Sequence, residues 1–158
     1  MNTNIIYISN SGNTKKLADA IGEAINIEPI DITKEHILPD TDLLFVGTGI
    51  YGGKPNEKMI NYIDNLPANK IKGAVIFGTS ASGKDNSQLL VNCLRAKNIE
   101  VYNQHYFCKG KFWFISKNHP NDVDLDRVSR FAKYIVEKIW FIVSTLPLRV
   151  DVRILLER

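Results

Sequence analysis

The chain has 158 residues, of which 44% are hydrophobic and 23% are charged, and its formal net charge is +3 at pH 7. This length suits one globular domain, and so small an excess of positive charge gives no reason to expect a nucleic-acid partner. The two cysteines, Cys93 and Cys108, are too few for a disulfide framework or a metal site, so we expect a reducing, cytoplasmic environment. Residues 1–4 are polar and the longest apolar run, 139–143, is short, so we expect neither a signal peptide nor an integral membrane segment.

Short apolar segments alternate along the chain with segments whose apolar residues recur every three or four positions. Strands that alternate with helices in this way predict a parallel sheet with crossover connections and helices on both faces. The expected strands are residues 4–8, 27–32, 42–47, 73–78 and 100–107. The expected helices are residues 14–25, 56–66, 87–97 and 124–138. The pattern predicts a doubly wound α/β fold with a five-stranded parallel sheet in the order 2-1-3-4-5.

Three polar, glycine-containing segments follow the first, third and fourth expected strands. They are SNSGNT (9–14), GTGIYG (47–52) and GTSASGKD (78–85). In the expected strand order these strand ends lie side by side, and such sheets bind ligands beyond the carboxyl ends of their strands, where the order reverses. The sequence therefore predicts a single ligand site built from three loops.

The first segment combines hydroxyl and amide groups with a glycine just before a helix. Ser9, Ser11 and Thr14 carry hydroxyls, Asn13 carries an amide, and Gly12 can adopt dihedrals that turn several N–H groups toward one point. The start of the helix adds free N–H groups and the positive end of its dipole. These features predict a phosphate site, although a polar turn that caps the helix would use the same residue types.

The other two segments match nucleotide-binding patterns only in part. Residues 47–52 spell G-x-G-x-x-G, but that fingerprint belongs to the first βα unit of a dinucleotide-binding fold, and the next strand here ends without an acidic residue. Residues 78–85 have the P-loop spacing up to Lys84, but Asp85 stands where Ser or Thr should ligate magnesium. A P-loop-type nucleotide-binding protein stays an alternative.

The segment SNSGNT resembles the phosphate loop of flavodoxins, [ST]-x-[ST]-G-N-T, which holds the phosphate of FMN, and the element order over residues 4–138 is similar to that family. The resemblance implies an FMN-binding, flavodoxin-like electron-transfer protein with no catalytic residue or metal site. Its first loop would hold the phosphate, and its second and third loops would flank the isoalloxazine ring. The implied cofactor-binding residues are Ser9, Asn10, Ser11, Gly12, Asn13, Thr14, Thr48, Gly49, Ile50, Tyr51, Gly52, Gly53, Thr79, Ser80, Ala81, Ser82 and Gly83.

Within these loops the resemblance implies three particular roles. Tyr51 would stack on the ring, although it also suits a surface tyrosine in a glycine-rich turn. Gly52 would permit the peptide rotation by which flavodoxins hydrogen-bond the flavin. The backbone N–H groups of residues 80–83 would face the pyrimidine edge of the ring and stabilise negative charge there.

The chain departs from typical flavodoxins in its charge, because its pI is near 8.8 and Gly53 and Lys54 stand where short-chain flavodoxins often carry acids. A similar Tyr-Gly step and a basic composition occur in flavodoxin-like protoporphyrinogen oxidases. A flavodoxin-like FMN oxidoreductase, similar to those enzymes or to quinone reductases, therefore stays an alternative to the electron carrier that we favour. A carrier implies redox partner proteins, and the sequence does not predict an oligomeric state.

Two C-terminal segments are not explained by the three loops. The segment YFCKGKFWF (106–114) places aromatic residues and lysines after the last strand, and it suits either a partner surface or a lid over the sheet edge. Residues 139–158 are apolar at more than half of their positions and contain Pro147. We expect a flavodoxin-like domain over residues 1–140 and a tail, 141–158, of open role: an oligomer contact, a membrane-surface segment or sequence foreign to the natural protein.

Overall fold

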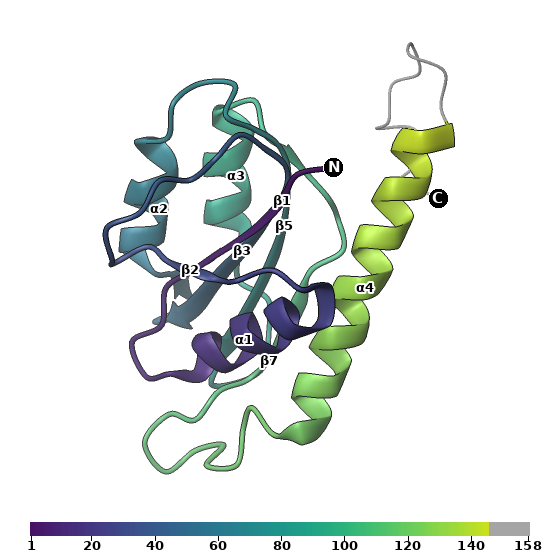
Figure 1. Ribbon diagram of the computed structural model, residues 1–158. Coiled ribbons are helices and arrows are strands. Elements are labelled where there is room, and N and C mark those ends of the chain that lie inside the picture. Colours follow the sequence, from purple (N-terminus) through teal and green to yellow (C-terminus); the bar gives the residue numbers. More distant parts are fainter. Residues whose placement is uncertain (146–158) are drawn as a thin grey trace.

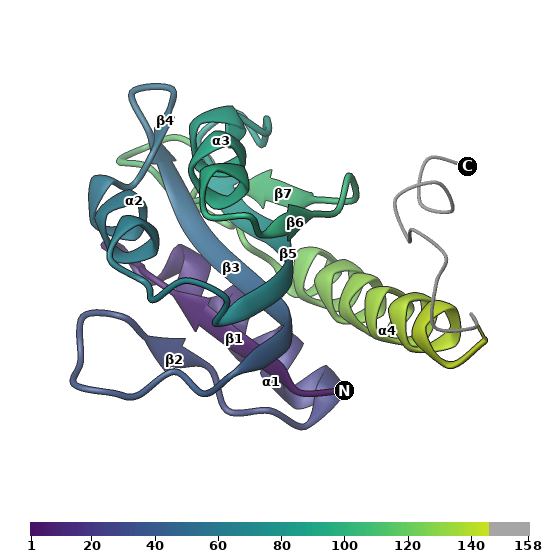
Figure 2. The ribbon, with the colours of Figure 1, turned by 90° about the horizontal axis from the view of Figure 1, so that it is seen from above.

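A parallel sheet forms the central layer of the computed structural model, which describes residues 1–145 (Figure 1). The strands are β1 (Thr3–Tyr7), β2 (Ile30–Asp31), β3 (Thr41–Tyr51), β4 (Lys54–Pro55), β5 (Ile71–Ser80), β6 (Glu100–Val101) and β7 (Tyr106–Lys109). The helices are α1 (Asn13–Ile25), α2 (Glu57–Asp64), α3 (Gln88–Ala96) and α4 (Asp122–Thr145). Seen from above, α1 and α4 lie on one face of the sheet and α2 and α3 on the other (Figure 2).

The strand order is β2-β1-β3-β5-β6, and all of these neighbours pair in parallel. This confirms the predicted doubly wound α/β fold. The fifth strand differs from the prediction because it is split into β6 and β7, which both pair with β5. The Tyr102 N–H still bonds the Ala74 carbonyl oxygen of β5, and its ring covers Gly73, but residues 103–105 leave the ladder and His105 bonds the Asp85 carboxylate.

The strands are apolar on both faces because each face is covered by helices. Successive residues of β1, such as Ile5 and Ile6, point into opposite layers of the core. The layer of Ile5 is completed by α1 and α4, and that of Ile6 by α2 and α3. This two-sided burial fixes the parallel strands in register, and so it fixes where their carboxyl ends lie.

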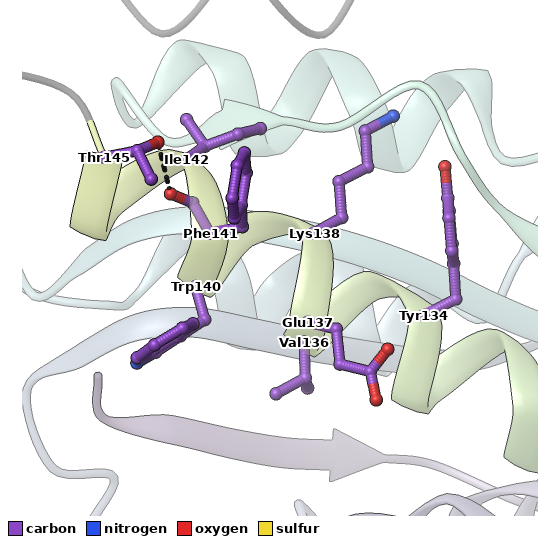
Figure 3. Close-up of a pocket in the computed structure, with 8 residues that line it drawn as sticks. All are labelled: Tyr134, Val136, Glu137, Lys138, Trp140, Phe141, Ile142 and Thr145. Atoms are coloured by element: carbon purple, nitrogen blue, oxygen red, sulfur yellow. Dashed lines mark hydrogen bonds between the residues drawn. The ribbon is translucent and has the colours of Figure 1, made fainter.

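Helix α4 is longer than the sequence pattern suggested. It was expected to end near residue 138, but it continues to Thr145 because Ile139 and Ile142 extend its buried stripe against the core. On its other side Trp140 and Phe141 are exposed, and with Tyr134 they border a shallow hollow on the helix surface (Figure 3). Residues 146–158 of the expected tail lie outside the described residues. Within residues 1–145, none of the helices has the length and hydrophobicity to cross a membrane.

Both cysteines are expected to resist alkylation in the folded protein. Burial and a 2.9 Å hydrogen bond to the Asp64 carboxylate raise the pKa of Cys93 to about 12, and burial followed by the charge of Asp124 does the same for Cys108. At pH 8 a pKa of 12 leaves roughly one thiol in ten thousand ionised, and the thiolate is the reactive form. Iodoacetamide labelling followed by mass spectrometry checks this. Asp64→Asn should speed labelling at Cys93 alone, and fast labelling of native Cys93 would contradict the assignment.

Candidate functional site

A cavity of about 470 Å³ opens at the carboxyl ends of the parallel strands. Loops that follow β1, β3, β5 and β7 line it, so segments far apart in the sequence meet at one place. The predicted cofactor-binding residues that line this cavity are Asn10, Ser11, Asn13, Ile50, Tyr51, Gly52, Thr79, Ser80 and Ala81. The remaining lining residues, Gly110, Lys111, Phe112 and Trp113, come from a fourth loop that the site prediction did not include.

The first loop leaves polar donors without partners at the start of α1. Gly12 caps this helix with a left-handed φ of 85°, no side chain of the described residues caps its first N–H groups, and its first turn holds no acidic residue. The Ser9 hydroxyl is buried and has no hydrogen-bond partner among the described residues. A buried hydroxyl without a partner is unfavourable unless something else bonds it. The loop is therefore chemically suited to an anion that accepts hydrogen bonds from these groups.

Two residues of the first loop instead hold neighbouring loops. The Asn13 side-chain amide donates to the carbonyl oxygen of Lys111 at 2.9 Å, and Asn13 is buried. The hydroxyls of Thr14 and Thr79 lie 3.3 Å apart in a buried hydrogen bond. These bonds connect the first loop to the fourth and third loops. The Asn13 and Thr14 side chains thus stabilise the arrangement of the loops, a role that the sequence pattern alone did not indicate.

The second loop is a tight β-hairpin between β3 and β4. Tyr51 pairs with Lys54, and the two residues between them, Gly52 and Gly53, have φ values of 56° and 77°. Two successive positive φ values define the type I′ turn that suits a two-residue hairpin, and glycine adopts them without strain. The turn between β3 and β4 therefore explains why two glycines follow Tyr51, without invoking any role in binding a cofactor.

The Tyr51 ring lies over Gly49, where an added Cβ would come within 2.8 Å of the ring. Tyr51 is 38% exposed and borders the cavity, so its ring is accessible from the cavity. Beneath it, the Thr48 hydroxyl accepts a hydrogen bond from the Asn56 backbone N–H at 3.1 Å. Thr48 and Gly49 are thus buried supports of the second loop and do not line the cavity.

Gly53 and Lys54 do not line this cavity. They line a separate hollow together with Asp85 and His105. The lysine that lines the main cavity is Lys111 of the fourth loop. The resemblance to short-chain flavodoxins drew attention to Lys54, but the positive charge at the cavity comes from Lys111.

The third loop turns sharply at Gly83, which has a φ of 77° and whose N–H donates to the Ser80 carbonyl oxygen at 3.3 Å. The Ser80 hydroxyl donates to the carbonyl oxygen of Lys84 at 3.0 Å, and the Ser82 hydroxyl accepts from the Lys84 N–H at 3.3 Å. These bonds close the loop on itself. Thr79, Ser80 and Ala81 line the cavity, whereas Ser82 and Gly83 of the same loop do not.

The segment 78–85 does not have the geometry of a P-loop. Helix α3 begins only at Gln88, whereas a P-loop helix follows its Lys directly. Asp85 accepts hydrogen bonds from the Ser87 N–H at 2.8 Å and from its hydroxyl at 2.5 Å, and its carboxylate lies 2.7 Å from His105 Nδ1. Burial opposes ionisation of Asp85, but the bonds from Ser87 and His105 outweigh it and lower its pKa. Asp85, whose carboxylate is already bonded to Ser87 and His105, takes the position at which a P-loop needs a Ser or Thr hydroxyl to ligate magnesium.

The glycines of the segment 47–52 serve packing and turning. Gly47 lies inside β3, where a Cβ would come within 2.4 Å of the Phe77 ring. The dinucleotide fingerprint needs its glycines in a loop between a strand and a helix. Here the loop leads into the short strand β4, so the G-x-G-x-x-G spacing has a packing explanation.

The fourth loop approaches the first and third loops closely at Gly110. A Cβ there would lie 2.9 Å from the Asn13 amide nitrogen and 3.0 Å from the Thr79 Cβ. The Gly110 N–H also donates to the Ser80 carbonyl oxygen at 2.9 Å. The run of aromatic residues and lysines after the last strand was the sequence signal for this loop, but the pattern did not distinguish a surface from a lid. In the structure it forms one wall of the cavity.

Comparison with known proteins shows which family the chain belongs to. A model of the flavodoxin domain matches residues 4–113. An uncharacterised protein of Methanocaldococcus jannaschii is 31% identical over 138 residues, which cover 79% of this chain and 91% of that protein.

Two solved structures show the same fold. A flavodoxin from the domain Archaea has a TM-score of 0.67 and 23% identity, with 88% of this chain and 99% of that chain covered. A Fusobacterium nucleatum flavodoxin bound to flavin mononucleotide has a TM-score of 0.63 and 13% identity, with coverages of 87% and 99%. The match of the domain model over most of the chain and the 31% identical relative show the family, and this chain belongs to the flavodoxin domain family.

Proposed function

We propose that this chain binds FMN in the four-loop cavity and acts as a one-electron carrier between redox proteins. The observation that carries the proposal is the buried Ser9 hydroxyl, which has no hydrogen-bond partner within residues 1–145 and belongs to the loop before α1, whose N-terminus no described side chain caps. A phosphate accepts several hydrogen bonds and is favoured by the positive end of a helix dipole. The flavin mononucleotide bound to the Fusobacterium nucleatum flavodoxin supports the choice of FMN.

Each loop then has a defined task. The first loop holds the phosphate through the Ser9 hydroxyl and the backbone N–H groups at the start of α1. Tyr51 and Trp113, which border the cavity from the second and fourth loops, supply aromatic surfaces for the ring. When bound, FMN supplies the one-electron chemistry, which no amino-acid side chain of the cavity provides. The charge of Lys111 at the cavity favours added negative charge there.

A carrier is favoured over a substrate-specific oxidoreductase because, among the described residues that line the cavity, only Tyr51 and Lys111 are of the types that commonly transfer protons. None of the described residues that line it is His, Asp, Glu or Cys. General acid–base catalysis relies mostly on these side chains. An exposed redox group next to a docking surface is all that electron transfer requires. We place the protein in the cytoplasm with redox proteins as its partners.

Titration of the purified, flavin-free chain with FMN tests the proposal. The protein should turn yellow, and flavin fluorescence should be quenched with one FMN bound per chain. ATP serves as the control ligand, and binding of ATP without binding of FMN would overturn the proposal. In the FMN-loaded protein, slow turnover with quinones and porphyrinogens is expected, and rapid oxidation of a porphyrinogen would show an enzyme in place of a carrier.

A further inference from the structure

We propose that the loop of residues 109–117 is a docking surface for an acidic redox protein. The inference rests on the proposed function, because it names the partner of the same site. The loop starts at Lys109, the last residue of β7, and in Figure 1 it extends at the bottom of the view beyond the strand ends before α4 begins. Phe112 and Trp113 also line the cavity, so a partner seated on this loop lies directly beside the redox group.

The first argument is the exposure of four consecutive apolar side chains. Trp113 is 77% exposed and Phe114 is 80% exposed, and Phe112 and Ile115 on either side of them are exposed as well. A single exposed apolar residue is ordinary on a protein surface, but a contiguous group is typical of an interaction site. Aromatic residues are also enriched among the side chains that dominate binding energy in interfaces.

The second argument is that the backbone holds these side chains outward. Phe112 and Ile115 exchange two hydrogen bonds, at 3.0 and 2.8 Å, and so close a tight turn with Trp113 and Phe114 at its tip. The Lys111 N–H donates to the His119 carbonyl oxygen at 2.9 Å, which fixes the base of the loop. These backbone hydrogen bonds hold the loop in one conformation, with its apolar side chains at the surface.

Trp113 adopts a left-handed φ of 51°, which is unfavourable for a residue with a large side chain. Strained conformations persist where the surrounding bonds impose them, and they are concentrated at functional sites. Packing does not require this one, since the Trp113 side chain is mostly exposed. Presentation of the ring to a partner explains why the strain is kept.

The third argument is charge. Lys109, Lys111 and Lys117 lie on this loop and Lys84 on the neighbouring third loop, and none of them forms a salt bridge among the described residues. Residues 109–118 contain no Asp or Glu. Lys117 Nζ lies 5.2 Å from the centre of the Phe114 ring, so positive charge and aromatic surface are adjacent. The complement of this surface is an acidic patch with an apolar centre.

The experiment measures electron transfer from the reduced, FMN-loaded protein to two small haem proteins, acidic cytochrome b5 and basic cytochrome c, by stopped-flow absorbance. The acidic acceptor should react faster, and its rate should fall as salt is added. The variant Lys109→Glu/Lys117→Glu changes charges that do not line the cavity and should slow the acidic acceptor about tenfold or more. Phe114→Ser should slow electron transfer to the acidic acceptor as well. Because this variant removes an apolar contact and no charge, the slowing should be the same at low and at high salt.

Matched variants provide the controls. Lys34→Glu/Lys133→Glu makes the same change in net charge away from the loop, and Phe141→Ser removes an exposed aromatic from α4; both should leave the rates unchanged. FMN titration of every variant separates the two proposals, because failure of the parent to bind FMN defeats the proposed function. Normal FMN binding with unchanged rates in Lys109→Glu/Lys117→Glu would overturn the docking surface. So would loop-dependent binding to phosphatidylglycerol vesicles with no effect on cytochrome b5, which would show a membrane-facing surface.

Discussion

Replacement of Ser9 by Ala is expected to weaken FMN binding by about ten- to a hundredfold and to leave riboflavin binding nearly unchanged. The Ser9 hydroxyl is buried and has no partner among the described residues. A hydrogen bond from it to a phosphate would be charge-assisted and worth roughly 1.5–3 kcal/mol, which corresponds to that change in affinity. Riboflavin has no phosphate, so it does not use this bond. Fluorescence titration with both ligands measures the ratio.

The flavin-free protein provides a second readout of the same substitution. Because the Ser9 hydroxyl makes no hydrogen bond to any described residue, its removal should leave the thermal midpoint of the flavin-free protein unchanged or slightly higher. Thr14→Val is the matched control, since the Thr14 hydroxyl bonds that of Thr79 and its loss should cost about 1 kcal/mol. Equal losses of FMN and riboflavin affinity in Ser9→Ala would show that Ser9 does not contact the phosphate.

The fold could be predicted because its signals are local and repeated. Apolar runs such as residues 42–47 and 73–78 are strands that lie buried in the middle of the sheet, and the helices between them keep a regular apolar stripe. The alternation of the two then leaves little choice of topology. The position of the cavity follows, because the carboxyl ends of parallel strands meet at one edge of the sheet. Sequence reasoning therefore predicted which end of the sheet carries the cavity, but not which individual side chains line it.

Individual roles depend on contacts between distant parts of the chain, which no local pattern encodes. The Asn13 amide bonds the backbone of Lys111, 98 residues away, and so it holds the fourth loop in place. The role of Gly110 could not be predicted for the same reason. Its lack of a side chain matters only because Asn13 and Thr79, which are distant in sequence, lie against it. Lys54 shows the opposite case: its sequence position suggested the site, but the hairpin turns it to another hollow.

Gly78→Ala is expected to destabilise the protein by about 3 kcal/mol and to weaken FMN binding as a consequence. A Cβ at Gly78 would lie 2.1 Å from the Thr48 carbonyl oxygen and 2.7 Å from the Phe107 ring. Thr48 pairs with Gly78 across β3 and β5, so the backbone can relieve this clash only if the two central strands separate. The second and third loops begin just beyond this pair, and their separation would widen the cavity. Thermal unfolding should show a midpoint lower by roughly 6–12 °C.

Gly73→Ala on the same strand is the matched control for that clash. The atoms nearest to a Cβ at Gly73 all belong to the Tyr102 ring and hydroxyl, at 2.8–3.1 Å. A side chain can rotate away where a strand backbone cannot, so this substitution should cost about 1 kcal/mol and leave FMN binding intact. Gly73 also lies at the amino end of β5, away from the loops of the site. If both variants lost stability and FMN affinity equally, the close contact of β3 with β5 at Gly78 would not be what positions the second and third loops.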